Sequence, residues 1–213
     1  MAGPMTADLT AVLAGGRVVP VLTVRAPATA GPLAEALAAG GATCAEVTFR
    51  TPDAEQVVKA MAAHGGLAVG AGTILDPEQA ERAVAAGAAF IVSPGFDEDV
   101  VAKCRELGVP VVPGIATATE LMRALRAGLD TVKLFPAEAI GGLRALRSLA
   151  APFPGVRFMP TGGIGVDQLA GYLAEPSVLA VGGSWMATPA HLDSGAYAEI
   201  RRLTAEAVEV GGR

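Results

Sequence analysis

Lys133 is the first residue of the chain that suggests chemistry. The chain contains only three lysines, and Lys133 alone lies in an apolar segment of strand character, residues 131–137. In an extended strand Val132 and Leu134 face one side, so Lys133 faces the other. Desolvation disfavours the ammonium form of a buried lysine, and the neutral amine is the nucleophile that forms Schiff bases. A lysine held in a structural salt bridge is the alternative interpretation.

A second predicted strand carries a carboxylate and a guanidinium on its polar face. The segment AEVTFR alternates between apolar and polar side chains, so Glu46, Thr48 and Arg50 share one face. The strand rise places Arg50 about 13 Å beyond Glu46. Glu46 would lie deep between the strands and could move protons, whereas Arg50 offers a fork suited to a carboxylate or phosphate. A buried Glu46–Lys133 ion pair without chemistry stays open as an alternative.

Two glycine-rich segments near the C-terminus predict an anion site. PTGGIG, residues 160–165, follows one strand-like run, and VGGSW, residues 181–185, ends the next. Glycines let backbone N–H groups approach an anion closely, and Thr161 and Ser184 add hydroxyl donors. Barrel proteins often hold a phosphate in the loops after strands seven and eight. The segment VGAGT, residues 69–73, lacks the third glycine of a dinucleotide fingerprint and is interpreted as the rim of the site, with Thr73 as a hydroxyl ligand.

These segments belong to a repeating pattern of strands and helices. Eight apolar runs alternate with Ala-, Leu- and Glu-rich segments of helical length, with a period of roughly 22 residues. The runs are residues 18–24, 45–49, 67–73, 90–94, 109–115, 131–137, 157–163 and 178–185. This pattern predicts an α/β protein with a (β/α)8 TIM barrel rather than a doubly wound sheet. Residues 6–16 predict an extra N-terminal helix that closes the bottom of the barrel, and residues 1–213 are expected to form one domain.

Composition excludes several functional classes. The 213 residues carry a formal net charge of −5 with both signs interspersed, which argues against nucleic-acid binding. The apolar runs are too short to span a membrane and no signal peptide is visible, so the expected protein is soluble and cytoplasmic. His64 and His191 are the only histidines and Cys44 and Cys104 the only cysteines. These are too few for a disulfide framework or a multi-histidine metal centre, so no metal or other cofactor is expected.

Several motifs, in order along essentially the whole chain, resemble those of one enzyme family. They are EVTFRT (46–51), VGAGTIL (69–75), FIVSPG (90–95), VPGIAT (112–117), VKLFPAE (132–138), PTGGI (160–164) and VGGSW (181–185). The family is the 2-keto-3-deoxy-6-phosphogluconate (KDPG) aldolases, also described as 4-hydroxy-2-oxoglutarate (KHG) aldolases. The resemblance implies a class I Schiff-base aldolase with a (β/α)8 barrel, without a metal, that forms a homotrimer. Its expected substrate is a phosphorylated keto acid, 2-dehydro-3-deoxy-6-phosphogluconate, which it cleaves to pyruvate and glyceraldehyde 3-phosphate in the Entner–Doudoroff pathway.

The resemblance also assigns roles to individual residues. Lys133 matches the Schiff-base lysine of the family, and Glu46 matches its general acid/base. The positions that match substrate-binding residues are Arg50, Thr73, Pro94, Phe135 and Thr161, and those that match phosphate-binding residues are Gly162, Gly163, Gly183 and Ser184. The segment ATATE, residues 116–120, departs from the Ser-or-Thr-Pro-Ser-Glu-like stretch usual in the family. Because it lies beside the expected pocket, it puts substrate preference, rather than the chemistry, in question.

Other functions fit parts of the same pattern. A sister aldolase would act on the C4 epimer, 2-dehydro-3-deoxy-6-phosphogalactonate, or on unphosphorylated 4-hydroxy-2-oxoglutarate to give pyruvate and glyoxylate. A phosphosugar isomerase or epimerase would share the barrel and the anion site, but it would not need an isolated inward-facing lysine. A non-catalytic barrel that only binds phosphosugars would need neither Lys133 nor Glu46.

Overall fold

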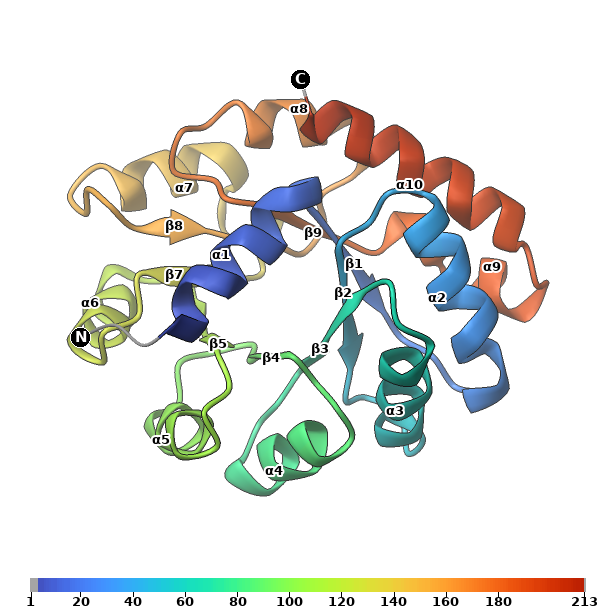
Figure 1. The fold of residues 1–213 in the computed structure, drawn as a ribbon. Helices are drawn as coiled ribbons and strands as arrows, with labels where there is room; N and C mark the ends of the chain where they lie inside the picture. Colours follow the sequence, from blue (N-terminus) through green and yellow to red (C-terminus); the bar gives the residue numbers. More distant parts are fainter. Residues whose placement is uncertain (1–3, 213) are drawn as a thin grey trace.

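The computed structural model describes the backbone of residues 4–212 and the side chains of residues 9–212. Parallel strands form the centre of the molecule, and helices surround them (Figure 1). The strands are β1 (Val18–Leu22), β2 (Cys44–Thr48), β3 (Ala68–Gly72), β4 (Phe90–Val92), β5 (Val111–Val112), β6 (Gly114–Ile115), β7 (Thr131–Leu134), β8 (Arg157–Phe158) and β9 (Val181–Gly183). All eight predicted runs therefore contain strand.

Helices connect successive strands, as expected for βαβ units. They are α1 (Pro4–Gly16), α2 (Ala30–Ala39), α3 (Ala54–His64), α4 (Pro77–Ala85), α5 (Glu98–Glu106), α6 (Ala118–Arg126), α7 (Gly142–Ala150), α8 (Val166–Leu173), α9 (Pro189–Asp193) and α10 (Tyr197–Gly211). Three short 3-10 helices, η1 (Pro27–Thr29), η2 (Glu138–Ile140) and η3 (Trp185–Ala187), lie in the connections.

Hydrogen bonds close the strands into a ring. The order β5-β4-β3-β2-β1-β9 forms one array, and β6-β7-β8 forms another. The predicted fifth run is interrupted at Pro113, which has no N–H to donate, so β5 pairs with β4 while β6 pairs with β7. Bridges from Phe158 to Val178 and from Thr161 to Gly182 join the β8 side to the β9 side. This closure confirms the predicted (β/α)8 barrel.

Local sequence explains where several helices start. Asp76 accepts a hydrogen bond from the backbone N–H of Gln79 at 2.7 Å, with Pro77 in the first helical turn of α4. Asp97 accepts one from Val100 N at 2.8 Å and begins α5. These caps satisfy N–H groups that have no partner within the helix.

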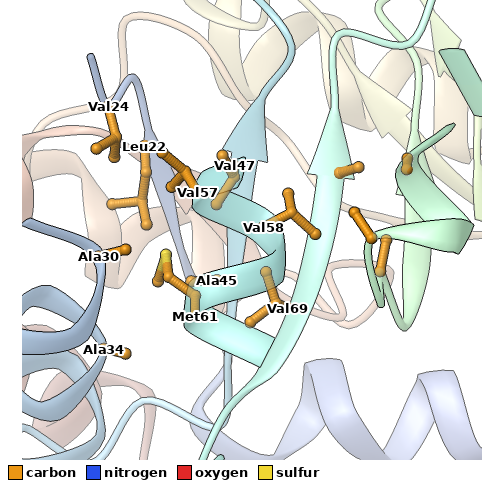
Figure 2. Close-up of a cluster of buried hydrophobic side chains, with 14 of the residues drawn as sticks. Leu22, Val24, Ala30, Ala34, Ala45, Val47, Val57, Val58, Met61 and Val69 are labelled. Carbon is orange, nitrogen blue, oxygen red and sulfur yellow. The ribbon is translucent and has the colours of Figure 1, made fainter. Parts of the chain in front are cut away.

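Apolar side chains on the outer face of the strands pack against the helices. Figure 2 shows this outer core around α3, where Ala45 and Val47 of β2 and Val69 of β3 lie near the helix. The α3 residues of the same buried cluster are Val57, Val58 and Met61. The prediction that Ala45 and Val47 face away from the barrel interior is confirmed.

Helix α1 closes one end of the barrel. Its residues Leu9 and Leu13 belong to an inner cluster of buried side chains supplied by strands around the ring. The other members are Val19, Cys44, Phe90, Val92, Val112, Met159 and Ala180. Figure 1 shows α1 crossing this end of the ring, as the sequence predicted. No helix within residues 4–212 is long and apolar enough to cross a membrane.

Candidate active site

A buried ion pair spans the interior of the barrel. Lys133 on β7 and Glu46 on β2 both point inward, and their side chains are 6% and 0% exposed. Lys133 Nζ lies 3.0 Å from Glu46 Oε1 and 3.2 Å from Oε2. In the closed ring four strand-to-strand steps separate β2 from β7 in either direction, so the two side chains meet from opposite walls. The predicted inward orientation of both residues is confirmed.

Glycine makes the space that the Glu46 carboxylate occupies. Gly72, at the end of β3, lies beside Thr48 in the register with β2. A Cβ at position 72 would overlap the carboxylate of Glu46, with both Cγ and Cδ at 2.5 Å. The next residue, Thr73, is half-buried and adopts a left-handed φ of 58°, which is unfavourable for a β-branched residue. The segment after β3 is therefore shaped around Glu46.

Phe135 lies between the lysine and the glycine-rich loop that follows β8. The centre of its ring is 5.3 Å from Lys133 Nζ, within the range of a cation–π contact. A Cβ on Gly162 would lie only 3.2 Å from the Phe135 ring. The Phe135 ring thus lies close to both Lys133 and the loop at Gly162.

Three of the predicted rim residues follow neighbouring strands. Arg50 is exposed in the turn after β2, Thr73 follows β3, and half-buried Pro94 follows β4. Because these strands are parallel and adjacent, the three residues lie at the same end of the barrel. The carbonyl of Pro94 lies so close to Gly114 of β6 that a side chain at position 114 would collide with it.

The two predicted anion loops lie side by side. Buried Thr161 bridges to Gly182, and Gly182 N donates to the carbonyl of Pro160 at 2.9 Å. Gly162 and Gly163 have φ of 102° and 80°, a region that favours glycine. Gly183, the last residue of β9, lies against the Trp185 ring, and Ser184 after it is exposed. Ser184 makes no side-chain cap hydrogen bond to η3.

The structure adds a hydroxyl pair that the sequence analysis did not identify. Thr48 donates a hydrogen bond to the carbonyl of Leu22 at 2.9 Å. Its single proton is then committed, so the 3.0 Å contact with Thr23 Oγ1 is donated by Thr23. The sequence did contain a signal for Thr23: the alternation of residues 18–24 places it on the same face of the strand as Val19.

The divergent segment at 116–120 forms a rigid start of α6. The carboxylate of Glu120 accepts hydrogen bonds from Ala116 N at 2.8 Å and from Thr117 N at 2.8 Å, and Thr117 caps the helix in return. Burial opposes ionisation of Glu120, but the hydrogen bonds from Ala116 and Thr117 outweigh it and hold the pKa of Glu120 below its ordinary value. Ala118 and Thr119 are exposed.

The described part of the chain, residues 4–212, contains no group of three or more His, Cys, Asp or Glu side chains arranged to hold a metal ion. His64 is exposed and His191 takes part in the cap of α9. The acidic run at 97–99 caps α5 and forms its first turn.

Comparison with known proteins places this chain in one family. A family model described as KDPG and KHG aldolase matches residues 9–203. A 2-dehydro-3-deoxy-phosphogluconate aldolase of Treponema pallidum is 48% identical over 197 residues, which cover 92% of this chain and 94% of that protein. A KDPG aldolase structure from Zymomonas mobilis with 3-phosphoglycerate is 44% identical, with a TM-score of 0.89 and coverage of 94% of both chains. A KDPG aldolase from Legionella pneumophila, with pyruvate captured at low pH as a covalent carbinolamine intermediate, is 38% identical. Its TM-score is 0.89, and the match covers 92% of this chain and 96% of that one. The chain therefore belongs to the KDPG and KHG aldolase family.

Proposed function

We propose that this chain is a class I aldolase that cleaves 2-dehydro-3-deoxy-6-phosphogluconate to pyruvate and glyceraldehyde 3-phosphate. The observation that carries the proposal is the buried Lys133–Glu46 pair in the barrel interior, together with two adjacent glycine-rich loops that follow β8 and β9. The names of the Treponema pallidum and Legionella pneumophila relatives support the substrate and the covalent route. Cleavage of 4-hydroxy-2-oxoglutarate to pyruvate and glyoxylate is proposed as a second activity of the same site.

The first step in this proposal is formation of the Schiff base. A proton moves from Lys133 Nζ to the Glu46 carboxylate across 3.0 Å and leaves a neutral amine. Nζ then attacks the C2 ketone of the keto acid. Glu46 returns its proton to the hydroxyl of the resulting carbinolamine, which leaves as water and gives an iminium, and Glu46 is again a carboxylate.

Bond cleavage follows from the electron demand of the iminium. Glu46, directly or through one water, removes the proton of the C4 hydroxyl, and that oxygen becomes the carbonyl of the aldehyde product. The electrons of the C3–C4 bond move to C3 and the iminium nitrogen, giving an enamine. Protonation at C3 restores the iminium, and its hydrolysis releases pyruvate and regenerates Lys133.

The remaining site residues are proposed to orient the substrate. Arg50 and Thr73 follow β2 and β3 and would hold the carboxylate and carbonyl portion derived from pyruvate, since a guanidinium binds a carboxylate in bidentate fashion. Pro94 and Phe135 would line the middle of the pocket. The phosphate would bind at the paired loops, through Thr161, Gly162, Gly163, Gly183 and Ser184.

Three further properties are proposed from the resemblance to the family. The chain is expected to act as a homotrimer, in the cytoplasm, with residues 1–213 as one domain. Light scattering of the purified protein tests the first of these: a mass of three chains supports it, whereas a mass of one or two chains contradicts it.

The direct test of the activity is a cleavage assay in which pyruvate release is followed with lactate dehydrogenase and NADH. The proposal predicts turnover on the phosphorylated gluconate-derived substrate with kcat in the usual enzymatic range of about 1–10³ s⁻¹. Lys133→Met should remove this activity, and Lys103→Met is the matched control because Lys103 lies on α5 and pairs with Glu81 and Glu106. Binding of the substrate without cleavage would contradict the proposal and favour a phosphosugar-binding barrel. A higher kcat/KM on the C4 epimer would instead identify the sister aldolase.

A further inference from the structure

Glu138 connects the strand that carries Lys133 with the first anion loop. It begins η2, four residues after the end of β7. Its backbone N–H donates to the carbonyl of Gly162 at 3.0 Å, and Ala137 N donates to Thr161 O at 2.8 Å. The loop at 161–163 is therefore hydrogen-bonded along its length to the segment that follows the lysine strand.

The side chain of Glu138 reaches across to helix α8. Its Oε1 accepts a hydrogen bond from the phenol of Tyr172, and its Oε2 accepts one from Gln168 Nε2 at 2.8 Å. The amide oxygen of Gln168 in turn accepts a hydrogen bond from Gly165 N at 2.8 Å, at the start of α8. Glu138 therefore holds the glycine loop at two places. Its backbone N–H binds the carbonyl of Gly162, and its carboxylate reaches Gly165 at the start of α8 through Gln168.

Close packing adds to this hydrogen-bonded link. A Cβ on Gly163 would lie 2.8 Å from Glu138 Cβ, so the loop rests directly on the stem of the glutamate. Gly163 adopts a φ of 80°, which its glycine identity permits. The contact with Glu138 therefore limits the positions open to the backbone of Gly163.

The outer side of this link is not packed. A surface pocket of about 380 Å³ lies between the start of α7 and helix α8, and it is lined by Glu138, Gly142, Leu143, Asp167, Gln168 and Tyr172. Hydrogen bonds rather than tight packing must therefore hold the Glu138 carboxylate in place. Burial and the neighbouring Glu138 carboxylate raise the pKa of Tyr172 above its ordinary range, so its phenol stays a donor.

We propose that Glu138, held by Tyr172 and Gln168, is a positioning residue for the phosphate of the substrate. It fixes the N–H groups of Gly162 and Gly163 in the direction that an incoming phosphate requires, and it has no contact with the reacting carbon atoms. The proposal rests on the proposed function, because it assumes that this loop receives the phosphate end of the keto acid.

Tyr172→Phe tests the proposal with the least disturbance, because the ring is fully buried and only the hydroxyl is removed. The variant should raise KM for the phosphorylated substrate about fivefold, the typical net effect of one lost hydrogen bond, with kcat changed less than about twofold. The constants for 4-hydroxy-2-oxoglutarate, which has no phosphate, should stay unchanged. The specificity ratio, kcat/KM for the phosphorylated substrate divided by kcat/KM for 4-hydroxy-2-oxoglutarate, is independent of the fraction of active protein.

Two further variants and one control complete the experiment. Glu138→Ala should lower the same ratio more strongly than Tyr172→Phe, and Glu138→Gln, which keeps one acceptor, should restore part of it. Gln168→Leu lies on the exposed side of α8, so it tests the same link if the Tyr172 variant folds poorly. Tyr197→Phe on α10 is the matched control, since Tyr197 is the only other tyrosine. This variant should leave kcat/KM unchanged for both substrates.

The exchange of pyruvate C3 protons with deuterium oxide, measured by NMR, separates two kinds of failure. Exchange needs the Schiff base but no phosphate, so all these variants should exchange at the rate of the wild type. Two outcomes would overturn the role of Glu138 and leave the proposed function intact. One is normal exchange with an unchanged specificity ratio, and the other is an equal loss of kcat/KM on both substrates. A wild-type protein that neither exchanges nor cleaves would overturn the proposed function itself.

Discussion

Lys133 Nζ lies 3.0 Å from Glu46 Oε1, although 87 residues separate the two along the chain. The barrel brings them together by placing their strands, β7 and β2, on opposite walls. A buried pair of this kind is weak evidence for stability, because desolvation of both charges offsets much of their attraction. The family resemblance assigns both residues to catalysis, so we explain the pair by its chemistry rather than by its effect on stability. The following variants test this explanation.

The effects of removing the two partners of the pair should not add. Lys133→Met leaves a buried carboxylate and Glu46→Gln a buried ammonium, and each should lower the free energy of unfolding by about 3–5 kcal/mol. The double variant should be less destabilised than the sum of the two by about 1–3 kcal/mol. Urea unfolding followed by circular dichroism measures all four proteins. Additive effects would mean that the two charges do not interact in the folded protein.

Gly72→Ala should reduce activity by displacing Glu46. The new methyl group would overlap a carboxylate that is fully buried and held by Lys133, so the carboxylate must move. A misplacement of about 1 Å can lower kcat by about 10²-fold. Gly31→Ala on α2 is the matched control, because nothing lies within 4 Å of the added methyl group. Steady-state kinetics measure kcat for both variants. If Gly72→Ala and Gly31→Ala have equal kcat values, Gly72 has no part in placing Glu46.

Arg50→Met should weaken binding of the keto acid without changing the fold. The guanidinium lies exposed at the end of β2, and loss of a bidentate contact to a carboxylate should raise KM at least about tenfold. Arg201→Met, on the exposed face of α10, should leave KM unchanged. The same assay with pyruvate as product inhibitor provides a second readout: its inhibition constant should rise in parallel. A normal KM with a normal inhibition constant would remove Arg50 from the site.

The two buried thiols predict a loss of stability in alkali. Burial raises the pKa of Cys44 to about 12 and that of Cys104 to about 11, from an ordinary value of 9.0. The thiol then ionises more readily in the unfolded chain, so the contribution to stability is present below pH 9 and is lost as the pH rises toward the folded pKa. Each thiol contributes a slope of at most about 1.4 kcal/mol per pH unit in that window.

Urea unfolding at pH 7.5 and pH 10 measures this effect. The free energy of unfolding of the wild type should be lower at pH 10 than at pH 7.5. The difference between the two pH values should be smaller in Cys44→Ala, which lacks the more deeply buried thiol. An identical pH dependence in the two proteins would show that Cys44 ionises no more readily in the unfolded chain than in the folded one.

Sequence periodicity predicted the strands, the extra helix and the inward direction of Glu46 and Lys133 because these depend on local alternation. The contact between the two charges depends on ring closure, and the ring closes through short pairings such as the bridge from Thr161 to Gly182. That pairing joins positions from separate runs. The two glycine-rich loops were therefore predicted to lie close together only because barrels often bind phosphate between the loops after strands seven and eight.

Other features of the site depend on contacts that have no sequence period. Gly72 resembles any strand glycine until the Glu46 carboxylate is seen beside it. The link from Glu138 to Tyr172 joins η2 to α8 across 34 positions, and neither residue type is unusual in its own segment. The interruption at Pro113 was visible in the sequence, yet its effect, a fifth run divided between two neighbours, follows from the pairing of β5 and β6.

The most direct test of the account is reductive trapping of the Schiff base. The wild-type protein is incubated with pyruvate and sodium borohydride, digested and analysed by mass spectrometry, with Lys133→Met treated in parallel. The account predicts a single pyruvate-derived adduct on Lys133 in the wild type and none in the variant. An unmodified wild-type chain, or an adduct on Lys59 or Lys103, would contradict it.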